Sequence, residues 1–234
     1  MSDKKITAVS YSRISTWRWC PAQLRFSAIM GLKQPSTPAM DEGNRVHKAL
    51  EVYVGHPGRV PPKYPTSMGA LRPELTKIRK DPERRCESQY AFDIKWQQCG
   101  YFDPQVRWRM KIDLRHSPAP NTIRLTDYKT GKLRPEKDEE QLQLYVLTEL
   151  LTAHQLPRTI ETALWYVSHE ELPRVIHVYE APFNKLKTKL RKYWEGEAAK
   201  VISDSRLAPT PTEFKCSRCF YSSKRGGPCK AAKA

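Results

Sequence analysis

The sequence has no long apolar run and lacks several motifs that would assign it to common protein classes. No stretch approaches the roughly 18 apolar residues of a membrane span, and residues 1–12 contain no signal-peptide core. A phosphate-binding P-loop is missing, and the letters HEE at 169–171 do not extend to the zinc motif HExxH. No internal repeat is visible. We therefore expect an intracellular protein without a membrane segment or a helicase motor of its own.

Acidic residues are also scarce relative to basic ones. The chain has 41 Lys and Arg against 25 Asp and Glu, a formal net charge of +16. An intracellular domain of this charge usually meets a polyanion, most often nucleic acid, although a basic surface that serves only solubility is the alternative. The electrostatic field of such a protein supplies affinity for the nucleic-acid backbone without sequence specificity.

The distribution of apolar residues predicts helices followed by strands, then a helix, two strands and a helix. This order indicates an α/β protein with a central mixed sheet flanked by helices. We expect one domain over residues 1–208 and a Cys-containing appendage over 209–234 that packs back on the first helix. The predicted helices are 10–30, 40–54, 71–80, 136–151 and 184–202, and the predicted strands are 87–94, 105–114, 122–128, 159–167 and 174–179, with a loop at 55–65 and a hairpin turn at 117–121.

An acid and a base follow one of these strands in the stretch LTDYKTGKLRP. Asp127 and Lys129 are two residues apart, so they point to the same face of a strand. A hairpin with the preceding strand would bring Asp113 close to Asp127, and two adjacent carboxylates need a cation between them. Mg²⁺ or Mn²⁺ suits that role and could activate a water against a phosphodiester. A solvated ion pair at a strand end is the alternative.

Five short stretches occur in an order that resembles a known family. They are YSRISTWRWCPAQLRF, EGNRVHKALE with its Gly-x-x-x-His spacing, KID, DYKTG, and QLQLY with its Gln-x-x-x-Tyr spacing. Together they resemble the PD-(D/E)XK nuclease superfamily, specifically its RecB-like exonuclease branch, which includes phage recombination exonucleases and CRISPR-associated spacer-acquisition nucleases. The resemblance implies a restriction-endonuclease-like fold.

The resemblance also implies roles for individual residues. Lys129 would be the catalytic lysine, and Gln141 and Tyr145 would orient the site and touch the DNA backbone. Taken alone, a helical His or a Gln and Tyr one turn apart are ordinary structural residues. Two positions depart from the family pattern: Met110 stands where many relatives have Gly, and Ile112 replaces the Pro of the family name. The implied metal ligands are His47, Asp113, Asp127 and the backbone carbonyl of Tyr128, with Glu51 and Glu87 supporting them from behind.

The tail contains a Cys-x-x-Cys pair, Cys216 and Cys219, followed by Cys229. The resemblance implies that these three and Cys20 bind a 4Fe-4S cluster, although the spacing before Cys229 is longer than is usual in the branch. Zinc, or no metal, are the alternatives. A cluster would connect the first helix to the tail and close a long loop. We expect Cys86 and Cys99 to be ordinary buried thiols.

Basic and aromatic residues alternate at several places in the chain. Such residues contact phosphates and stack on unpaired bases, but we expect Trp17, Trp19 and Trp108 to belong to the core. The basic residues between 185 and 192 fit either a solvated helix face or a series of phosphate contacts.

These observations predict a Mg²⁺- or Mn²⁺-dependent DNA exonuclease of recombination, repair or phage DNA processing. We expect it in the cytoplasm of a bacterium or of a phage-infected host cell. Its partners would be DNA and a helicase or single-strand annealing protein. The alternatives are a catalytically silent DNA-binding or assembly subunit of the same fold, and a Cys-rich zinc or iron–sulfur reader of nucleic acid.

Overall fold

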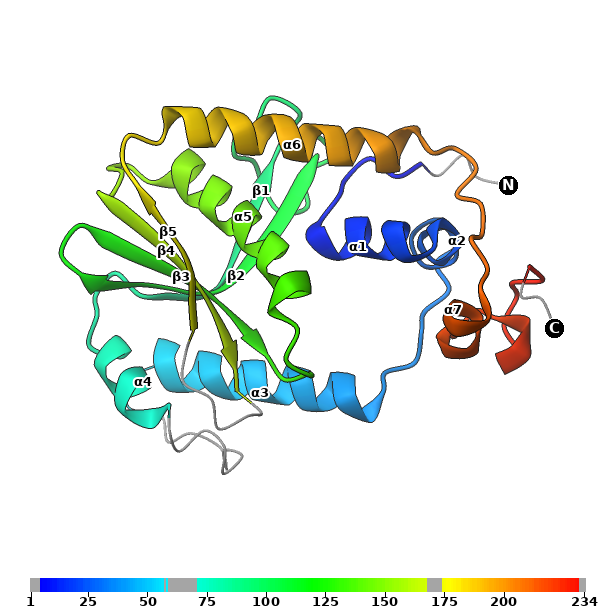
Figure 1. Cartoon of the computed structure of the whole chain (residues 1–234), viewed down its shortest axis with the longest axis horizontal. Helices are drawn as coiled ribbons and strands as arrows, with labels where there is room; N and C mark the ends of the chain where they lie inside the picture. The colour runs from blue at the N-terminus through cyan, green and yellow to red at the C-terminus, as the bar shows by residue number, and fades with distance from the viewer. Residues whose placement is uncertain (1–4, 57, 59–70, 168–173, 232–234) are drawn as a thin grey trace.

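A computed structural model describes residues 5–56, 58, 71–167 and 174–231 of the chain (Figure 1). Most of the predicted loop at 55–65, and the residues at 169–171, lie outside the described residues. None of the helices within the described ranges has the length and apolar character needed to cross a membrane.

The centre of the fold is a sheet of five strands in the order β1-β2-β3-β4-β5. Neighbouring strands are antiparallel except β3 and β4, which are parallel. The parallel pair requires a crossover, which the helix α5 supplies. The predicted mixed sheet flanked by helices is therefore confirmed. The strands are β1 (Arg85–Phe92), β2 (Trp108–Ala119), β3 (Thr122–Lys129), β4 (Thr159–Tyr166) and β5 (Arg174–Glu180).

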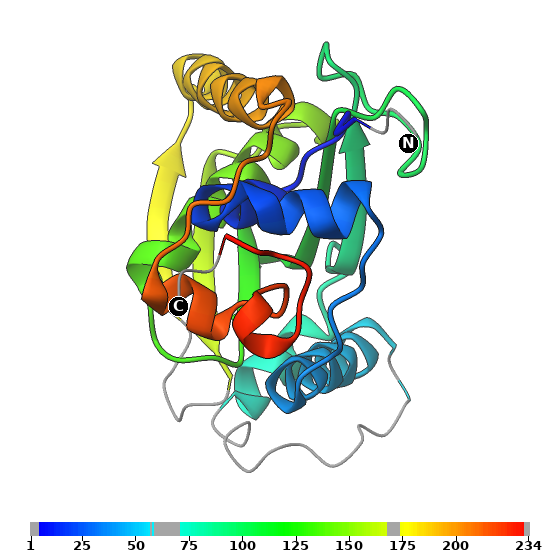
Figure 2. The same cartoon turned by 90° about the vertical axis from the view of Figure 1, so that its right-hand side faces the viewer.

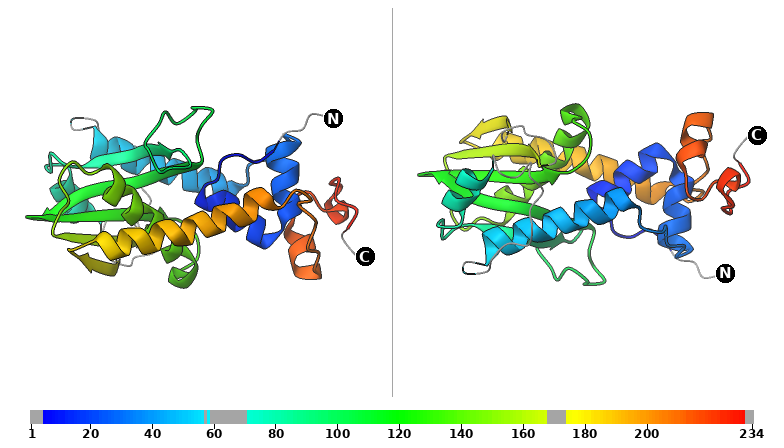
Figure 3. Two further views of the ribbon diagram at one scale, coloured as in Figure 1. Left: turned by 90° about the horizontal axis from the view of Figure 1, so that it is seen from above. Right: turned by 90° about the horizontal axis from the view of Figure 1, so that it is seen from below.

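Helices cover both faces of this sheet (Figures 1 and 3). One face carries α3 and α4, and the other carries α5, α6 and α1. Two separate apolar clusters fill the two interfaces. The helices are α1 (Tyr11–Trp19), α2 (Pro21–Leu24), a π-helical turn (Arg25–Ile29), α3 (Pro38–Gly55), α4 (Arg72–Ile78), α5 (Pro135–Thr152), α6 (Asn184–Ser203), α7 (Glu213–Arg218) and a 3-10 turn (Ser223–Arg225).

Strand β3 is covered on both sides, which decides where its polar residues point. Leu125 packs in the cluster beneath α5, whereas Tyr128 packs in the cluster beneath α3. Because successive side chains alternate between faces, Asp127 and Lys129 share the α5 side with Leu125. Asp127 and Lys129 therefore both face α5.

The first predicted helix is wrong as a single element. The chain leaves helical geometry at Cys20, which is extended with φ −162° and ψ 110°, and starts again with Pro21 as the first residue of α2. Proline lacks an amide hydrogen and disfavours helical geometry at the residue before it. The break places Cys20 at a corner between two helices.

The predicted hairpin turn is also shorter than expected. Strand β2 continues to Ala119, and the turn consists of Pro120 and Asn121, with Asn121 in the left-handed region at φ 57°. The pairing of β2 with β3 is irregular between His116 and Ala119. Pro118 is tolerated there because no ladder hydrogen bond needs its missing amide hydrogen.

The tail has regular elements and an apolar contact with the N-terminal part of the chain. Besides α7 and the 3-10 turn, it contributes Tyr221, which packs with Ala22 of α2 and Phe26 of the π-helical turn. The Tyr221 hydroxyl donates to the Leu32 carbonyl at 2.8 Å. Figures 1 and 2 show the tail beside α1 and α2, which are far from it in the sequence. A Cβ at Gly227 would lie 2.3 Å from the Tyr221 backbone, so only glycine fits this approach.

The expectation that tryptophans belong to the core is confirmed for two of the three. Trp108 is buried and stacks on Trp96 at a centroid distance of 4.8 Å. Trp17 is partly buried against the same cluster, with its indole N–H donating to Asp204. Trp19 is only half-buried and belongs to none of the apolar clusters formed by the described residues.

The two remaining cysteines are less enclosed than predicted. Cys86 and Cys99 are half-buried rather than buried. Burial still raises the pKa of the Cys86 thiol to about 12, so it stays protonated at neutral pH.

A buried ion pair joins β2 to α5. The Arg115 guanidinium donates two hydrogen bonds to the Glu149 carboxylate, each at 2.8 Å, and both side chains are buried. Without Glu149 the buried Arg115 keeps, among the described residues, only a 3.7 Å contact with the exposed Glu83 carboxylate and a hydrogen bond to the Glu83 carbonyl, so we expect Glu149→Ala to lower the free energy of unfolding by about 3 kcal/mol. Urea denaturation measures this. The control is Glu42→Ala, which breaks an exposed pair with Arg45 and should leave the midpoint unchanged. Equal midpoints for both variants would contradict the prediction.

Candidate active site

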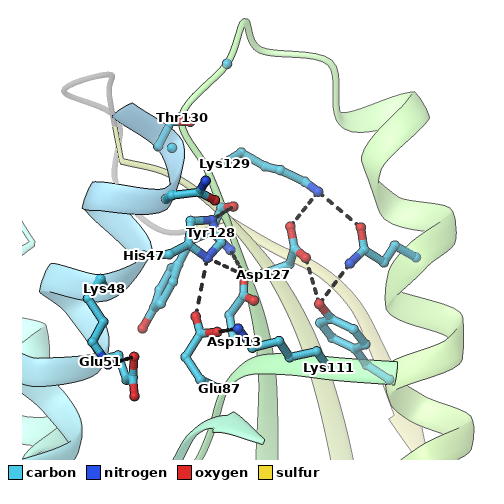
Figure 4. A pocket seen from close by; sticks show the side chains of 15 residues that line it. His47, Lys48, Glu51, Glu87, Lys111, Asp113, Asp127, Tyr128, Lys129 and Thr130 are labelled. Atoms are coloured by element: carbon cyan, nitrogen blue, oxygen red, sulfur yellow. Dashed lines mark hydrogen bonds and ion pairs between the residues drawn. The ribbon is translucent and has the colours of Figure 1, made fainter. Parts of the chain in front are cut away.

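The predicted acid and base of β3 meet two residues of α5. Lys129 Nζ lies 2.6 Å from Asp127 Oδ2 and donates to Gln141 Oε1 at 3.2 Å. The Gln141 amide donates to the Tyr145 hydroxyl at 2.9 Å, which in turn donates to Asp127 Oδ1 at 2.8 Å (Figure 4). Gln141 and Tyr145 are one helical turn apart and therefore share a face. The four side chains form a closed hydrogen-bonded ring.

A second group of residues lies on the other side of Asp127. The buried carboxylate of Asp113 accepts a hydrogen bond from the Tyr128 amide at 2.8 Å. His47, from α3, places Nδ1 3.5 Å from Asp113 Oδ2 and Nε2 3.0 Å from the Tyr128 carbonyl oxygen. The hairpin and the helix thus bring together the residues that the sequence motifs selected. All of them line one pocket of about 620 Å³.

Glu87 occupies a more central position than the supporting one expected for it. Its carboxylate lies 3.4 Å from His47 Nδ1, and Glu87, His47 and Asp113 offer ligand atoms that are all within 4.8 Å of one another. Glu87 adopts φ 52°, a strained backbone conformation for a residue with a side chain. Its neighbours Cys86 and Ser88 pair with the neighbours of Asp113, so Glu87 stands opposite Asp113 in the sheet.

Lys111 is a pocket residue that sequence reasoning missed. It lines the pocket and forms an ion pair with Glu87 (Figure 4). The signal that could have found it is its place two residues before Asp113, because i and i+2 side chains share a strand face. Glu51, predicted to support the ligands, also lines the pocket, where its carboxylate lies 2.7 Å from Lys48 Nζ.

A glycine allows α3 to approach the loop after β3. Gly43 lies one turn before His47 on α3 and lines the pocket together with Thr130 of that loop. A Cβ at Gly43 would lie 3.2 Å from Thr130 Oγ1, closer than most real contacts. The Gly-x-x-x-His spacing therefore places His47 one turn from the point where its helix approaches the loop most closely.

Buried carboxylates dominate the electrostatics of the pocket. Burial and the neighbouring Asp127 carboxylate raise the pKa of Asp113 from 3.8 to about 8. Burial lowers the pKa of Lys129, but Asp127 outweighs it and the net shift is upward. The same balance, with Glu87 and Asp113 as the acids, raises the pKa of His47. The protein thus holds protons at positions where a cation would relieve the repulsion.

The donor set fits a hard divalent cation. Carboxylate oxygens, a backbone carbonyl and one imidazole converge on one side of the pocket, and Mg²⁺ and Mn²⁺ prefer oxygen ligands. Lys129 stands beside this group with its ammonium directed at Asp127. The arrangement can hold a cation and present a separate positive charge to an anionic substrate.

The four tail-associated cysteines share a smaller pocket. Cys20, Cys216, Cys219 and Cys229 all line it. Among the described residues, no three of their sulfur atoms lie within 4.8 Å of one another. Tetrahedral zinc with Zn–S bonds of about 2.3 Å needs sulfurs about 3.8 Å apart, so the sulfurs are not arranged as a zinc site.

We expect Asp113→Asn to stabilise the metal-free protein at high pH. Because the folded pKa of Asp113 is raised to about 8 from 3.8, the folded state holds its proton longer than the unfolded state, and this contribution to stability is lost as the pH rises through that window. In EDTA, the melting temperature of the variant should exceed that of the wild type at about pH 8, and the two should be equal near pH 4. Added Mg²⁺ should raise the melting temperature of the wild type alone. An equal gain at both pH values would contradict the prediction.

Comparisons with known proteins complete the description of the site. A solved structure titled "Crystal structure of SSO0001" is 10% identical, with a TM-score of 0.47 over 100% of this chain and 90% of that chain. No curated protein matches the sequence. The sequence profile of the PD-(D/E)XK nuclease superfamily matches residues 8–223, which span the sheet, the pocket and the first part of the tail. The chain belongs to the PD-(D/E)XK nuclease superfamily.

Proposed function

We propose that the protein is a Mg²⁺- or Mn²⁺-dependent DNA exonuclease of the RecB-like branch, acting in recombination, repair or phage DNA processing. The observation that carries the proposal is the position of Lys129. Its ammonium contacts Asp127 and Gln141, immediately beside the group formed by His47, Glu87 and Asp113. A lysine ammonium held next to a group of acids that suits a divalent cation is the arrangement that phosphodiester hydrolysis needs.

The roles of the residues follow from their contacts. His47, Asp113, Asp127 and the Tyr128 carbonyl would hold the divalent cation, which supplies Lewis acidity and an activated water when bound. Glu87 is close enough to join them. Lys129 stabilises the charge that develops on the scissile phosphate. Gln141 and Tyr145 hold Lys129 and Asp127 at fixed positions through the hydrogen bonds described above.

The charge of the protein supports DNA as the substrate. The chain carries a net +16, and Lys48 and Lys111 line the pocket together with Lys129. These cations are suited to the phosphates that flank a scissile bond. A helicase or a single-strand annealing protein would supply the DNA ends.

We also propose that the four cysteines bind a 4Fe-4S cluster that attaches the tail, residues 209–234, to the nuclease domain, residues 1–208. Supporting this, Cys20, at the break between α1 and α2, lines the same pocket as the three tail cysteines. A cubane separates its thiolates more widely than zinc does, because each thiolate binds a different iron. The superfamily match continues past residue 208 into the tail.

The nuclease proposal predicts that Lys129→Ala abolishes cleavage of linear duplex DNA in Mg²⁺ or Mn²⁺ and leaves DNA binding in EDTA within a few fold. The loss follows because one preorganised charge at a phosphoryl centre contributes about 10²–10³ in rate. The matched control is Lys95→Ala, an exposed lysine on the β1–β2 loop, which should cleave normally. Wild-type protein that binds DNA but never cuts it would instead identify a silent DNA-binding subunit.

A comparison of linear and circular substrates tests the exonuclease assignment. An end-dependent enzyme degrades the linear form and spares a covalently closed circle of the same sequence. Cleavage of both at equal rates would identify an endonuclease with the same metal site.

The cluster proposal predicts brown protein with iron and sulfide after anaerobic purification. Cys229→Ser should lose the broad visible absorbance because one thiolate ligand is removed, whereas Cys99→Ser, outside the cysteine pocket, should keep it. Metal analysis that finds zinc, or no metal, in the wild type would refute the cluster.

A further inference from the structure

An aromatic side chain of the tail stands exposed beside Trp19. Phe214, on α7, has 57% of its surface exposed, and its ring centroid lies 5.8 Å from that of Trp19 at an interplanar angle of 59°. Trp19 ends α1, and its carbonyl accepts a hydrogen bond from Thr210 of the tail at 3.3 Å. The two rings therefore form a surface from segments far apart in the sequence.

Both rings carry a cation. The Arg218 guanidinium carbon lies 3.8 Å from the centroid of Phe214, and Lys215 Nζ lies 5.7 Å from that of Trp19. Among the described residues, neither Arg218 nor Lys215 forms an ion pair with a carboxylate. We call Trp19, Phe214, Lys215 and Arg218 the tail platform. It combines an exposed and a half-buried aromatic ring with positive charge, as proteins that bind single-stranded nucleic acid do.

Attachment of the tail does not require Phe214. The tail is already fixed by Tyr221, which packs with Ala22 and Phe26 and donates to the Leu32 carbonyl. Phe214 belongs to none of the apolar clusters that the described residues form. The Phe214 ring is therefore available at the surface, and what distinguishes it from other exposed rings such as Phe102 is its place beside Trp19 and two cations.

The platform is connected to the active-site pocket through residues that are neighbours in sequence of its members. Arg18, which precedes Trp19, places Nη1 2.6 Å from Glu140 Oε2 on α5, and the next residue, Gln141, lines the pocket. Figures 1 and 2 place α7 at the end of the molecule where α1 ends and α3 begins. Gly43, in the first half of α3, lines the pocket on that side.

We propose that the tail platform binds unpaired bases of a single-stranded DNA segment adjacent to the scissile phosphate. The proposal rests on the DNA nuclease function proposed above and specifies its substrate as DNA with a single-stranded end. Bases stack on Phe214 and Trp19, and Lys215 and Arg218 contact the phosphates between them. The charge of the platform selects a nucleic acid over an apolar peptide.

Fluorescence anisotropy in EDTA tests the platform without cleavage. Phe214→Ala should weaken binding of a short single-stranded oligonucleotide roughly 5- to 100-fold, since stacking on one aromatic side chain accounts for this range, and should leave blunt duplex affinity unchanged. Phe214→Trp should keep single-strand affinity. The matched control is Phe102→Ala: this ring is 82% exposed and lies 5.9 Å from the Arg109 guanidinium, on the β1–β2 loop that Figures 2 and 3 show apart from α7.

Two further readouts separate stacking from a structural role. An oligonucleotide with 2-aminopurine should lose fluorescence on binding the wild type and keep it with Phe214→Ala. Lys215→Gln should lower the salt dependence of single-strand binding by about 0.7 in the log–log slope. Equal losses of single-strand and duplex affinity in Phe214→Ala, or unchanged single-strand affinity, would overturn the platform. Stacking without any metal-dependent cleavage would overturn the nuclease function and leave the platform standing.

Discussion

The repulsion between two buried carboxylates, Asp113 on β2 and Asp127 on β3, is the constraint around which the pocket is built. Each side chain would be costly alone in an apolar interior. The protein balances them with partners from three directions: the Tyr128 amide from the strand itself, His47 from α3, and Lys129 and Tyr145 from the α5 side. These partners do not fully compensate the burial and mutual repulsion of the two carboxylates, because the pKa of Asp113 remains raised. A divalent cation would relieve that repulsion, so the metal binding that we propose would depend on how the sheet brings the two strands together.

That arrangement needs both faces of the sheet to be closed. The two apolar clusters hold α3 and α5 against opposite sides of β3, and the alternation of the strand then divides its residues between them. Tyr128 anchors the strand under α3 while its carbonyl faces His47. Asp127 and Lys129 face α5, where they form hydrogen bonds with Tyr145 and Gln141, which are one helical turn apart. The residues that hold the helices on the sheet are therefore next to, or the same as, those that line the pocket. A shift of either helix would move its pocket side chains away from Asp113 and Asp127.

Much of the site could be predicted from the sequence because its motifs follow one another in the order of the family that the sequence resembles. Strand alternation then places Asp127 and Lys129 on one face. His47, Gln141 and Tyr145 were selected by the resemblance, and the helical turn explains only why Gln141 and Tyr145 share a face. Glu87 was assigned only a supporting role, because its position opposite Asp113 depends on the register of β1 against β2 and on a left-handed backbone at Glu87. Lys111 shares the strand face of Asp113, but its ion pair with Glu87 depends on the same register. The break at Pro21 was visible in the sequence, but apolar spacing on both sides of it favoured one long helix. The spacing of the cysteine sulfurs depends on tail packing over nearly the whole chain length, which no local pattern encodes.

The close approach of α3 to the loop after β3 has a consequence for the lining of the pocket. At Gly43 the helix carries a hydrogen atom in place of a side chain, and a Cβ there would lie 3.2 Å from the Thr130 hydroxyl oxygen. An alanine at this position would therefore require Thr130 to shift, and Thr130 itself lines the pocket. A change of one carbon on α3 would thus reach the site through a neighbouring side chain, while every acid, lysine and histidine of the pocket kept its chemical identity.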